Sequence, residues 1–192
     1  MLGRGKDIRQ IDIADSYEAI GPEIATAIIG FHSFTGCDFT SKFNGKSKKS
    51  SWKLLLKSDG EILKAFHNLS NPNTDLDSYL IGLEKFVINL YEKNDTQFLS
   101  SLGSLRWSLF SKYQYESAKL PPTTSALEKK ILRSRFVSNM WSQAHLPIMK
   151  LLDLEACGWK KRDDGSLQAI TTDLPPAPVA IVETSLCRCK TS

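Results

Sequence analysis

Apolar residues recur along most of this chain at the three- and four-residue spacing that is typical of amphipathic helices. The clearest pattern covers residues 76–91, where apolar side chains follow the i, i+3, i+4, i+7 rule without interruption. It predicts a helix with one face in the core. Residues 22–34 are apolar on nearly every side and begin with proline after Gly21. They predict a buried helix that ends at Gly36.

Two short helices are expected after this one. The first begins near Lys48 and runs to Lys57. Ser58 and Glu61 then have the spacing of a capping box, in which two side chains satisfy free backbone amides at a helix start. They predict a second helix that runs through Phe66 and stops before the Asn-Pro-Asn sequence at 71–73.

The second half of the chain has weaker helix signals. Residues 96–113 have apolar residues at helical spacing, interrupted by Gly103. Ser125 and Glu128 predict another capping box, for a helix that runs through Trp141. We expect the basic residues of this helix on its outer side, namely Lys129, Lys130, Arg133 and Arg135.

Strands are expected in only a few places. Residues 8–13 alternate in part between apolar and polar, which predicts a short strand. Residues 158–162 and 166–170 flank an Asp-Asp-Gly sequence at 163–165 that is typical of a hairpin turn. Residues 174–178 are rich in proline and predict an extended tail. The fold class predicted from these patterns is mainly α with a small C-terminal β-hairpin.

The distribution of charge is more informative than its sum. The chain has 192 residues, of which 41% are hydrophobic, and a formal net charge of only +4. Residues 41–58 hold six lysines and no acidic residue, residues 59–95 are acidic overall, and residues 96–150 are basic again. A lysine cluster of this kind suits a surface that binds phosphates, and it suits a merely solvated face equally well.

The cysteines and the N-terminal sequence indicate where in the cell the protein is expected. Four scattered cysteines do not make a disulfide framework, and no apolar run has the length of a secretion signal or of a membrane span. We therefore expect an intracellular protein, of nucleus or cytoplasm, with no membrane partner. Cys187 and Cys189 would supply two of the four ligands of a zinc site in a longer cysteine-rich segment.

The lysine cluster follows a glycine turn and leads into a helix N-terminus. Free amides and the helix dipole favour an anion at such a place. We therefore predict that this corner binds the phosphodiester backbone of a nucleic acid, through Gly45, Lys46, Lys48, Lys49 and Lys53. Trp52 lies in the same segment and is expected in the core rather than as a platform for stacking bases.

Asp38 is the one carboxylate that we consider a candidate metal ligand. Cleavage of phosphodiesters with Mg²⁺ requires several carboxylates that converge on one or two ions, and one aspartate is not enough. Asp12 and Asp15 are expected to be helix caps instead. The three histidines are scattered, and the sequence contains no catalytic triad or nucleotide-binding loop. We expect no catalytic residue and no cofactor in this chain alone.

Residues 8–66 resemble the end of the nuclease core in the flap endonuclease and XPG superfamily of PIN-like nucleases. The resemblance rests on a short strand, a Gly-x-Asp motif at 36–38 after a helix, and a helix-two-turn-helix-like element at 44–56. It implies that Asp38 binds a metal, Mg²⁺ in a complete nuclease centre, and that Gly45 and the following lysines bind the DNA backbone. The chain departs from the family in having one glycine in the turn and in lacking the preceding strands and carboxylates, so it looks like a fragment.

The whole chain is similar to the C-terminal part of uncharacterised, transposon-associated proteins. The matching phrases are spread over nearly the full length, at residues 31–38, 45–49, 120–123, 158–159 and 174–178. Such proteins often continue into a cysteine-rich tail, which Cys187 and Cys189 would begin.

Together these observations predict a partial PIN-like region at 1–70, a helical extension at 71–147, and a hairpin with a Pro-rich tail at 148–192. The predicted function is that of a nucleic-acid-binding fragment of a nuclease-like, transposon-associated protein. We expect it to be inactive alone because most metal-binding carboxylates are missing. Two alternatives stay open: a Mg²⁺-dependent structure-selective nuclease when full length, or a protein-interaction scaffold that uses helix 76–91 or the tail. The sequence does not identify protein partners.

Overall fold

The computed structural model describes residues 10–92, 101–113 and 119–173. In this part of the chain the fold is mainly helical with one two-stranded antiparallel sheet, as the sequence predicts. The elements are α1 (Ile13–Ile20), α2 (Pro22–Phe34), α3 (Lys48–Leu55), α4 (Gly60–Leu69), α5 (Asp77–Tyr91), α6 (Leu102–Tyr113), α7 (Thr124–Ser142), β1 (Trp159–Lys161) and β2 (Leu167–Ala169). None of the helices in the described ranges is long and apolar enough to cross a membrane.

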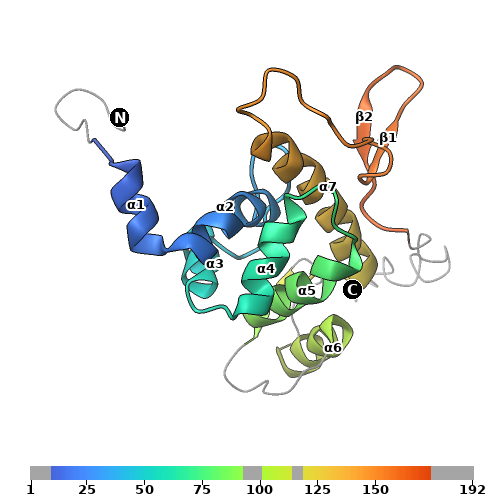
Figure 1. The fold of residues 1–192 in the computed structure, drawn as a ribbon. Coiled ribbons are helices and arrows are strands. Elements are labelled where there is room, and N and C mark those ends of the chain that lie inside the picture. The colour runs from blue at the N-terminus through green and yellow to red at the C-terminus, as the bar shows by residue number, and fades with distance from the viewer. Residues whose placement is uncertain (1–9, 93–100, 114–118, 174–192) are drawn as a thin grey trace, which may run out of the picture.

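Helices α2, α4, α5 and α7 pack against one another and form the body of the molecule (Figure 1). α3 lies at one side of this body, and α6 lies beside α5. α1 projects away beyond the start of α2, and the hairpin of β1 and β2 stands on the side of α7.

The core is built around phenylalanine rings in edge-to-face contact. Phe66 of α4 and Phe86 of α5 have ring centroids 4.9 Å apart. Phe31 and Phe34 of α2 pack on both of these rings at centroid distances between 5.7 and 6.3 Å. Such pairs stabilise by about 0.5–1.5 kcal/mol beyond the burial of their area. The C-terminal turn of α2 is therefore held at the centre of the fold.

Several predicted elements are confirmed. α2 begins at Pro22 after Gly21, and α3 begins at Lys48. The helix with the clearest apolar pattern is α5, Asp77–Tyr91. The turn at 163–165 joins β1 and β2, in which Lys160 pairs with Gln168.

Some predictions fall partly or wholly outside the described residues. Of the helix expected at 96–113, the structure describes α6, which starts at Leu102. The Pro-rich segment at 174–178 lies outside the described residues, as do Cys187 and Cys189.

The prediction of a strand at 8–13 is wrong for residues 10–13, the part of this segment that the structure describes. Residues 10–12 have no regular structure, and Ile13 begins α1. Oδ1 of Asp12 accepts hydrogen bonds from the backbone amides of Ala14 (2.7 Å) and Asp15 (3.3 Å). The expectation that Asp12 is a cap is confirmed, and this helix start outweighs the partial alternation of apolar residues.

Both predicted capping boxes start at the wrong residue. α4 is capped by Asp59, whose Oδ1 accepts from the Ile62 amide at 3.1 Å, while Ser58 donates to the carbonyl of Leu54. α7 is capped by Thr123, whose Oγ1 accepts from the Ala126 amide at 3.2 Å. In each case another good capping residue lies one or two positions away, so the local sequence allowed two starts.

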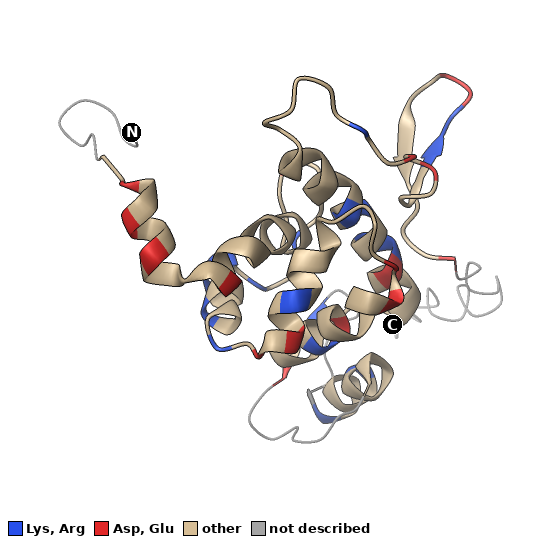
Figure 2. Ribbon diagram, viewed as in Figure 1, with Lys and Arg blue, Asp and Glu red and all other residues tan. Residues whose placement is uncertain are grey.

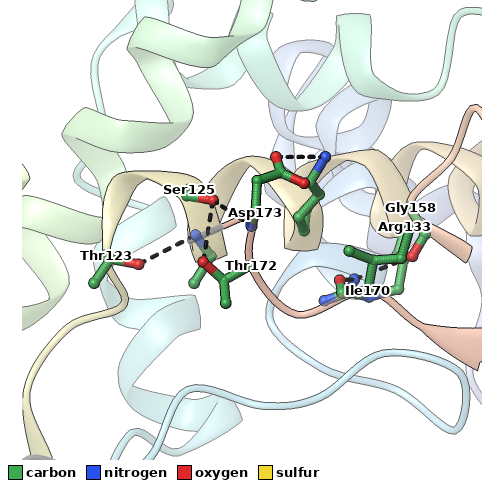
Figure 3. A network of polar contacts seen from close by, with 9 residues as sticks. Thr123, Ser125, Arg133, Gly158, Ile170, Thr172 and Asp173 are labelled. Carbon is green, nitrogen blue, oxygen red and sulfur yellow. Dashed lines mark hydrogen bonds and ion pairs between the residues drawn. The ribbon is translucent and has the colours of Figure 1, made fainter. Parts of the chain in front are cut away.

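Ser125 instead anchors the segment that follows the hairpin (Figure 3). Its Oγ accepts hydrogen bonds from Thr172 Oγ1 (3.2 Å) and from the Asp173 amide (2.9 Å). Nζ of Lys129 lies 2.8 Å from Oδ2 of Asp173. The segment after β2 is thus attached to the first turns of α7 by polar contacts.

The expectation that the basic residues of α7 face outward is wrong for Lys130 and Arg133, which are both buried. Nη1 of Arg133 donates to the carbonyls of Ile170 and, at 3.4 Å, of Gly158 (Figure 3). Arg135 donates to the carbonyls of Pro72 and Thr74. These cations supply hydrogen-bond donors to carbonyls of the loops that pack against α7.

The predicted domain boundaries stay a prediction. One hydrophobic cluster contains residues from Ala27 to Ile131, so its members lie on both sides of the expected boundary at residue 70.

Close packing of α2 on α4 leads to a prediction about stability. A Cβ on Gly30 would overlap the carbonyl oxygen of Phe66. We expect Gly30→Ala to lower the free energy of unfolding by about 1–3 kcal/mol, since the two helices must move apart. Urea unfolding followed by tryptophan fluorescence measures this change.

The matched control is Gly103→Ala in α6, where an added Cβ meets no atom closer than 4.0 Å. This variant should be as stable as the wild type or more stable, because alanine favours helix over glycine by about 1 kcal/mol. Equal stability of the Gly30→Ala variant and the wild type would contradict the packing described here.

Candidate nucleic-acid interface

The predicted interface lies at the corner where α2 passes into α3. A loop at residues 35–47 joins the two helices, and its ends turn at Gly36 (φ 112°) and Gly45 (φ 69°), in conformations that suit glycine. The amide of Lys46 bonds to the carbonyl of Phe43 at 3.1 Å, which closes the second turn. Phe43 itself is buried against Phe34. The loop is therefore fixed to the core before α3 begins.

Lys48, the first residue of α3, holds the end of α2. Its Nζ donates hydrogen bonds to the carbonyls of His32 (2.8 Å) and Gly36 (2.7 Å), and to Oγ1 of Thr35 (2.8 Å). The last carbonyls of a helix lack partners within it and favour a cation. Burial lowers the pKa of Lys48 below its usual value. This ammonium group already has three acceptors, so its first role is structural.

Lys130 reaches the same loop from α7. Its Nζ donates to the carbonyl of Ser41 and faces the rings of Phe43 and Phe34, at 4.6 and 5.7 Å from their centroids. The residue is 6% exposed, and burial is the main cause that lowers its pKa to about 7, with the neighbouring Arg133 acting in the same direction. Nothing in the sequence near Lys130 signals this contact, because Ser41 lies 89 positions away.

Lys46 is engaged in another way. Its Nζ lies 4.5 Å from the ring centroid of Tyr91 in α5, a cation–π contact. The ring of Tyr91 is buried, and burial raises the pKa of its hydroxyl to about 12. Lys46 thus joins the start of α3 to the end of α5.

Lys49 and Lys53 differ from these three lysines. They lie four residues apart, on one face of α3, and both are exposed, as Lys48 is, so they differ from Lys48 in their partners and not in their exposure. Within the described part of the chain, neither side chain has a hydrogen-bond or ion-pair partner. Figure 2 shows basic residues on α3 and acidic residues on α1. The predicted lysine cluster is therefore one structural group and one pair of free ammonium groups.

Asp38 is exposed in the loop after α2. Its charge raises the pKa of His32, but burial and the charge of Lys48 oppose it, and together they lower that pKa below its usual value. No group of three or more His, Cys, Asp or Glu residues that could hold a metal ion is found in the described ranges. Asp38 alone offers a metal one carboxylate.

A pocket of about 510 Å³ opens beside the free lysines, between α2, α3 and the end of α7. Its walls are mainly apolar and include Trp52, Trp141 and Ile28, with Lys49 at α3. The ring of His32 lies 5.3 Å from that of Trp141, with a tilt of 32° between the planes. Trp52 is half-buried, with its ring 5.7 Å from Phe31. It therefore packs on the core and also lines the pocket.

The sequence predicted the lysines of α3 as site residues, but it placed Trp52 in the core and did not indicate Trp141. Trp52 and the lysines of α3 belong to one segment, whereas Trp141 comes from α7, and only the packing of α7 on α2 brings it to His32.

In comparisons with known proteins, no protein-family model matches the chain, and no curated protein or solved structure matches it. The resemblances drawn from the sequence, and the roles that they imply for Asp38 and Gly45, stay predictions.

The burial of Lys130 predicts a pH dependence of stability. Its pKa is about 7 in the fold and 10.5 without the fold, so between these values the unfolded chain binds one more proton than the folded chain. The free energy of unfolding should therefore rise with pH from about 7 to 9, with up to about 1.4 kcal/mol per pH unit from this group.

Lys130→Met should lack this contribution, while the surface variant Lys49→Met should keep it. Chemical unfolding of the three proteins at several pH values measures the slopes. Parallel curves for the wild type and Lys130→Met would contradict the assignment.

Proposed function

We propose that this chain binds nucleic acid through the exposed face of α3, with the ammonium groups of Lys49 and Lys53 on backbone phosphates. The observation that supports this most strongly is the pairing of two free cations, one helical turn apart, with an aromatic-lined pocket next to them. A phosphate backbone attracts such cations without regard to base sequence, so the binding should depend strongly on salt.

The remaining predicted residues have supporting roles in this proposal. Lys46 and Lys48 are held by Tyr91 and by the end of α2, and they add positive potential near the phosphates. Gly45 shapes the turn before α3, since its φ of 69° is unfavourable for other residues.

We further propose that α2, the loop at 35–47 and α3 form the helix-two-turn-helix-like element of a PIN-like, transposon-associated protein. The order of helix, glycine turn and basic helix supports this. In a complete nuclease, Asp38 would supply one oxygen ligand to Mg²⁺, and other carboxylates would have to come from elsewhere in the longer protein. On this proposal the present chain binds nucleic acid without cleaving it.

The scaffold alternative is less supported, because the apolar face of helix 76–91 is used inside the fold. Tyr79, Leu83 and Phe86 of α5 are fully buried. The Pro-rich tail lies outside the described residues.

The test is binding of a labelled oligonucleotide, measured by fluorescence anisotropy at several salt concentrations. The double variant Lys49→Ala/Lys53→Ala should bind more weakly than the wild type, and its slope of log affinity against log salt should be smaller by about 1.5, because two phosphate contacts are lost.

The double variant Lys160→Ala/Lys161→Ala is the control, since it removes the same charge from the hairpin on another side of the molecule (Figure 1). It should bind as the wild type does. If both double variants lose the same affinity, only overall charge matters and the interface on α3 is refuted.

A further inference from the structure

We infer that the pocket between α2, α3 and α7 takes one unpaired base of a single strand, while the phosphates beside that base lie on Lys49 and Lys53. This inference rests on the proposed function and names its substrate class. It goes beyond that function because charge on α3 alone would serve single and double strands equally.

The walls of the pocket suit a flat aromatic ligand. Trp52 and Trp141 both line it, and the imidazole of His32 lies 5.3 Å from the ring of Trp141, with 32° between the ring planes. Bases stack on such side chains with little regard to sequence, because every base has a π-face. Burial and Lys48 lower the pKa of His32, which favours the uncharged form of its ring beside Trp141.

The size of the pocket also suits this ligand. Small-molecule pockets commonly have volumes of about 300–1,000 Å³, and the volume here is about 510 Å³. A base with part of its sugar fits such a space, whereas a duplex, whose bases are stacked in its interior, can enter only by flipping a base out.

The charges around the pocket select a strand with phosphates over a neutral peptide. Every charged side chain among the lining residues is a lysine. Lys49 belongs both to the lining and to the free face of α3, and Lys53 follows one turn later. A base in the pocket therefore brings its flanking phosphates next to two free ammonium groups. Because these charges are complementary, we assign a nucleotide as the ligand of the pocket.

The experiment compares three ligands of the full chain: an oligothymidine of about 12 nucleotides, the same strand with abasic sites throughout, and a duplex of that length. All keep their phosphates, and only the first offers freely accessible bases. Stacking contributes about 1–3 kcal/mol per base, so with one base in the pocket the oligothymidine should bind about 5- to 160-fold more tightly than the abasic strand. It should also bind more tightly than the duplex and quench tryptophan fluorescence.

The variant Trp141→Leu provides the matched test on the protein. It should narrow the difference in affinity between the oligothymidine and the abasic strand, since the indole of Trp141 is lost while Trp52, His32 and the lysines remain. The abasic strand tests the wild-type protein directly, so a variant that folds poorly does not weaken the experiment.

The possible failures are distinguishable. If the wild type binds all three ligands equally and still depends on Lys49 and Lys53, the base pocket is refuted and the proposed function stands. If the wild type binds none of the ligands at low salt, the proposed function itself is refuted. Association of the chain with itself that Trp141→Leu abolishes, without effect of any oligonucleotide, would assign the pocket to a second copy and also refute the inference.

Discussion

Two lysine side chains, bonded to main-chain carbonyls, hold together the corner on which the candidate site depends. Lys48 bonds to the carbonyls at the end of α2, and Lys130 bonds from α7 to the carbonyl of Ser41. The loop between α2 and α3 has few backbone hydrogen bonds of its own, and these two side chains supply donors to its carbonyls at Gly36 and Ser41. They join α3 and its preceding loop to α2 and to α7, which is distant in the sequence, and they set where α3 lies.

The placement of α3 determines which lysines can meet a ligand. Lys48, the first residue of α3, points back toward α2, whereas Lys49 and Lys53, which are one turn apart from each other, share a different face of the helix. Lys49 and Lys53 are left exposed, and Trp52 between them turns toward Phe31 and the pocket. A cluster that looks uniform in the sequence is thereby divided into lysines that stabilise the fold and lysines that can bind phosphate.

The helices with long apolar patterns were predictable from the sequence, and so was the hairpin at its Asp-Asp-Gly turn, because these depend on residues close together in the chain. The helix starts at Asp59 and Thr123 were missed because neighbouring serines offered equally good caps. Two features could not be predicted: the inward direction of Lys130 and the contact of Trp141 with His32. Both arise from tertiary packing, and the sequence around a lysine or a tryptophan does not indicate a distant partner.

The most direct test of this account is the rate at which each lysine reacts with an amine-acetylating reagent, read by mass spectrometry with and without bound oligonucleotide. The account predicts fast reaction at Lys49 and Lys53, slow reaction at Lys48 and Lys130, and protection by the oligonucleotide at Lys49 and Lys53 but not at Lys160. Reaction of Lys48 as fast as that of Lys49, or equal protection of all surface lysines, would contradict the division of the cluster on which the account is built.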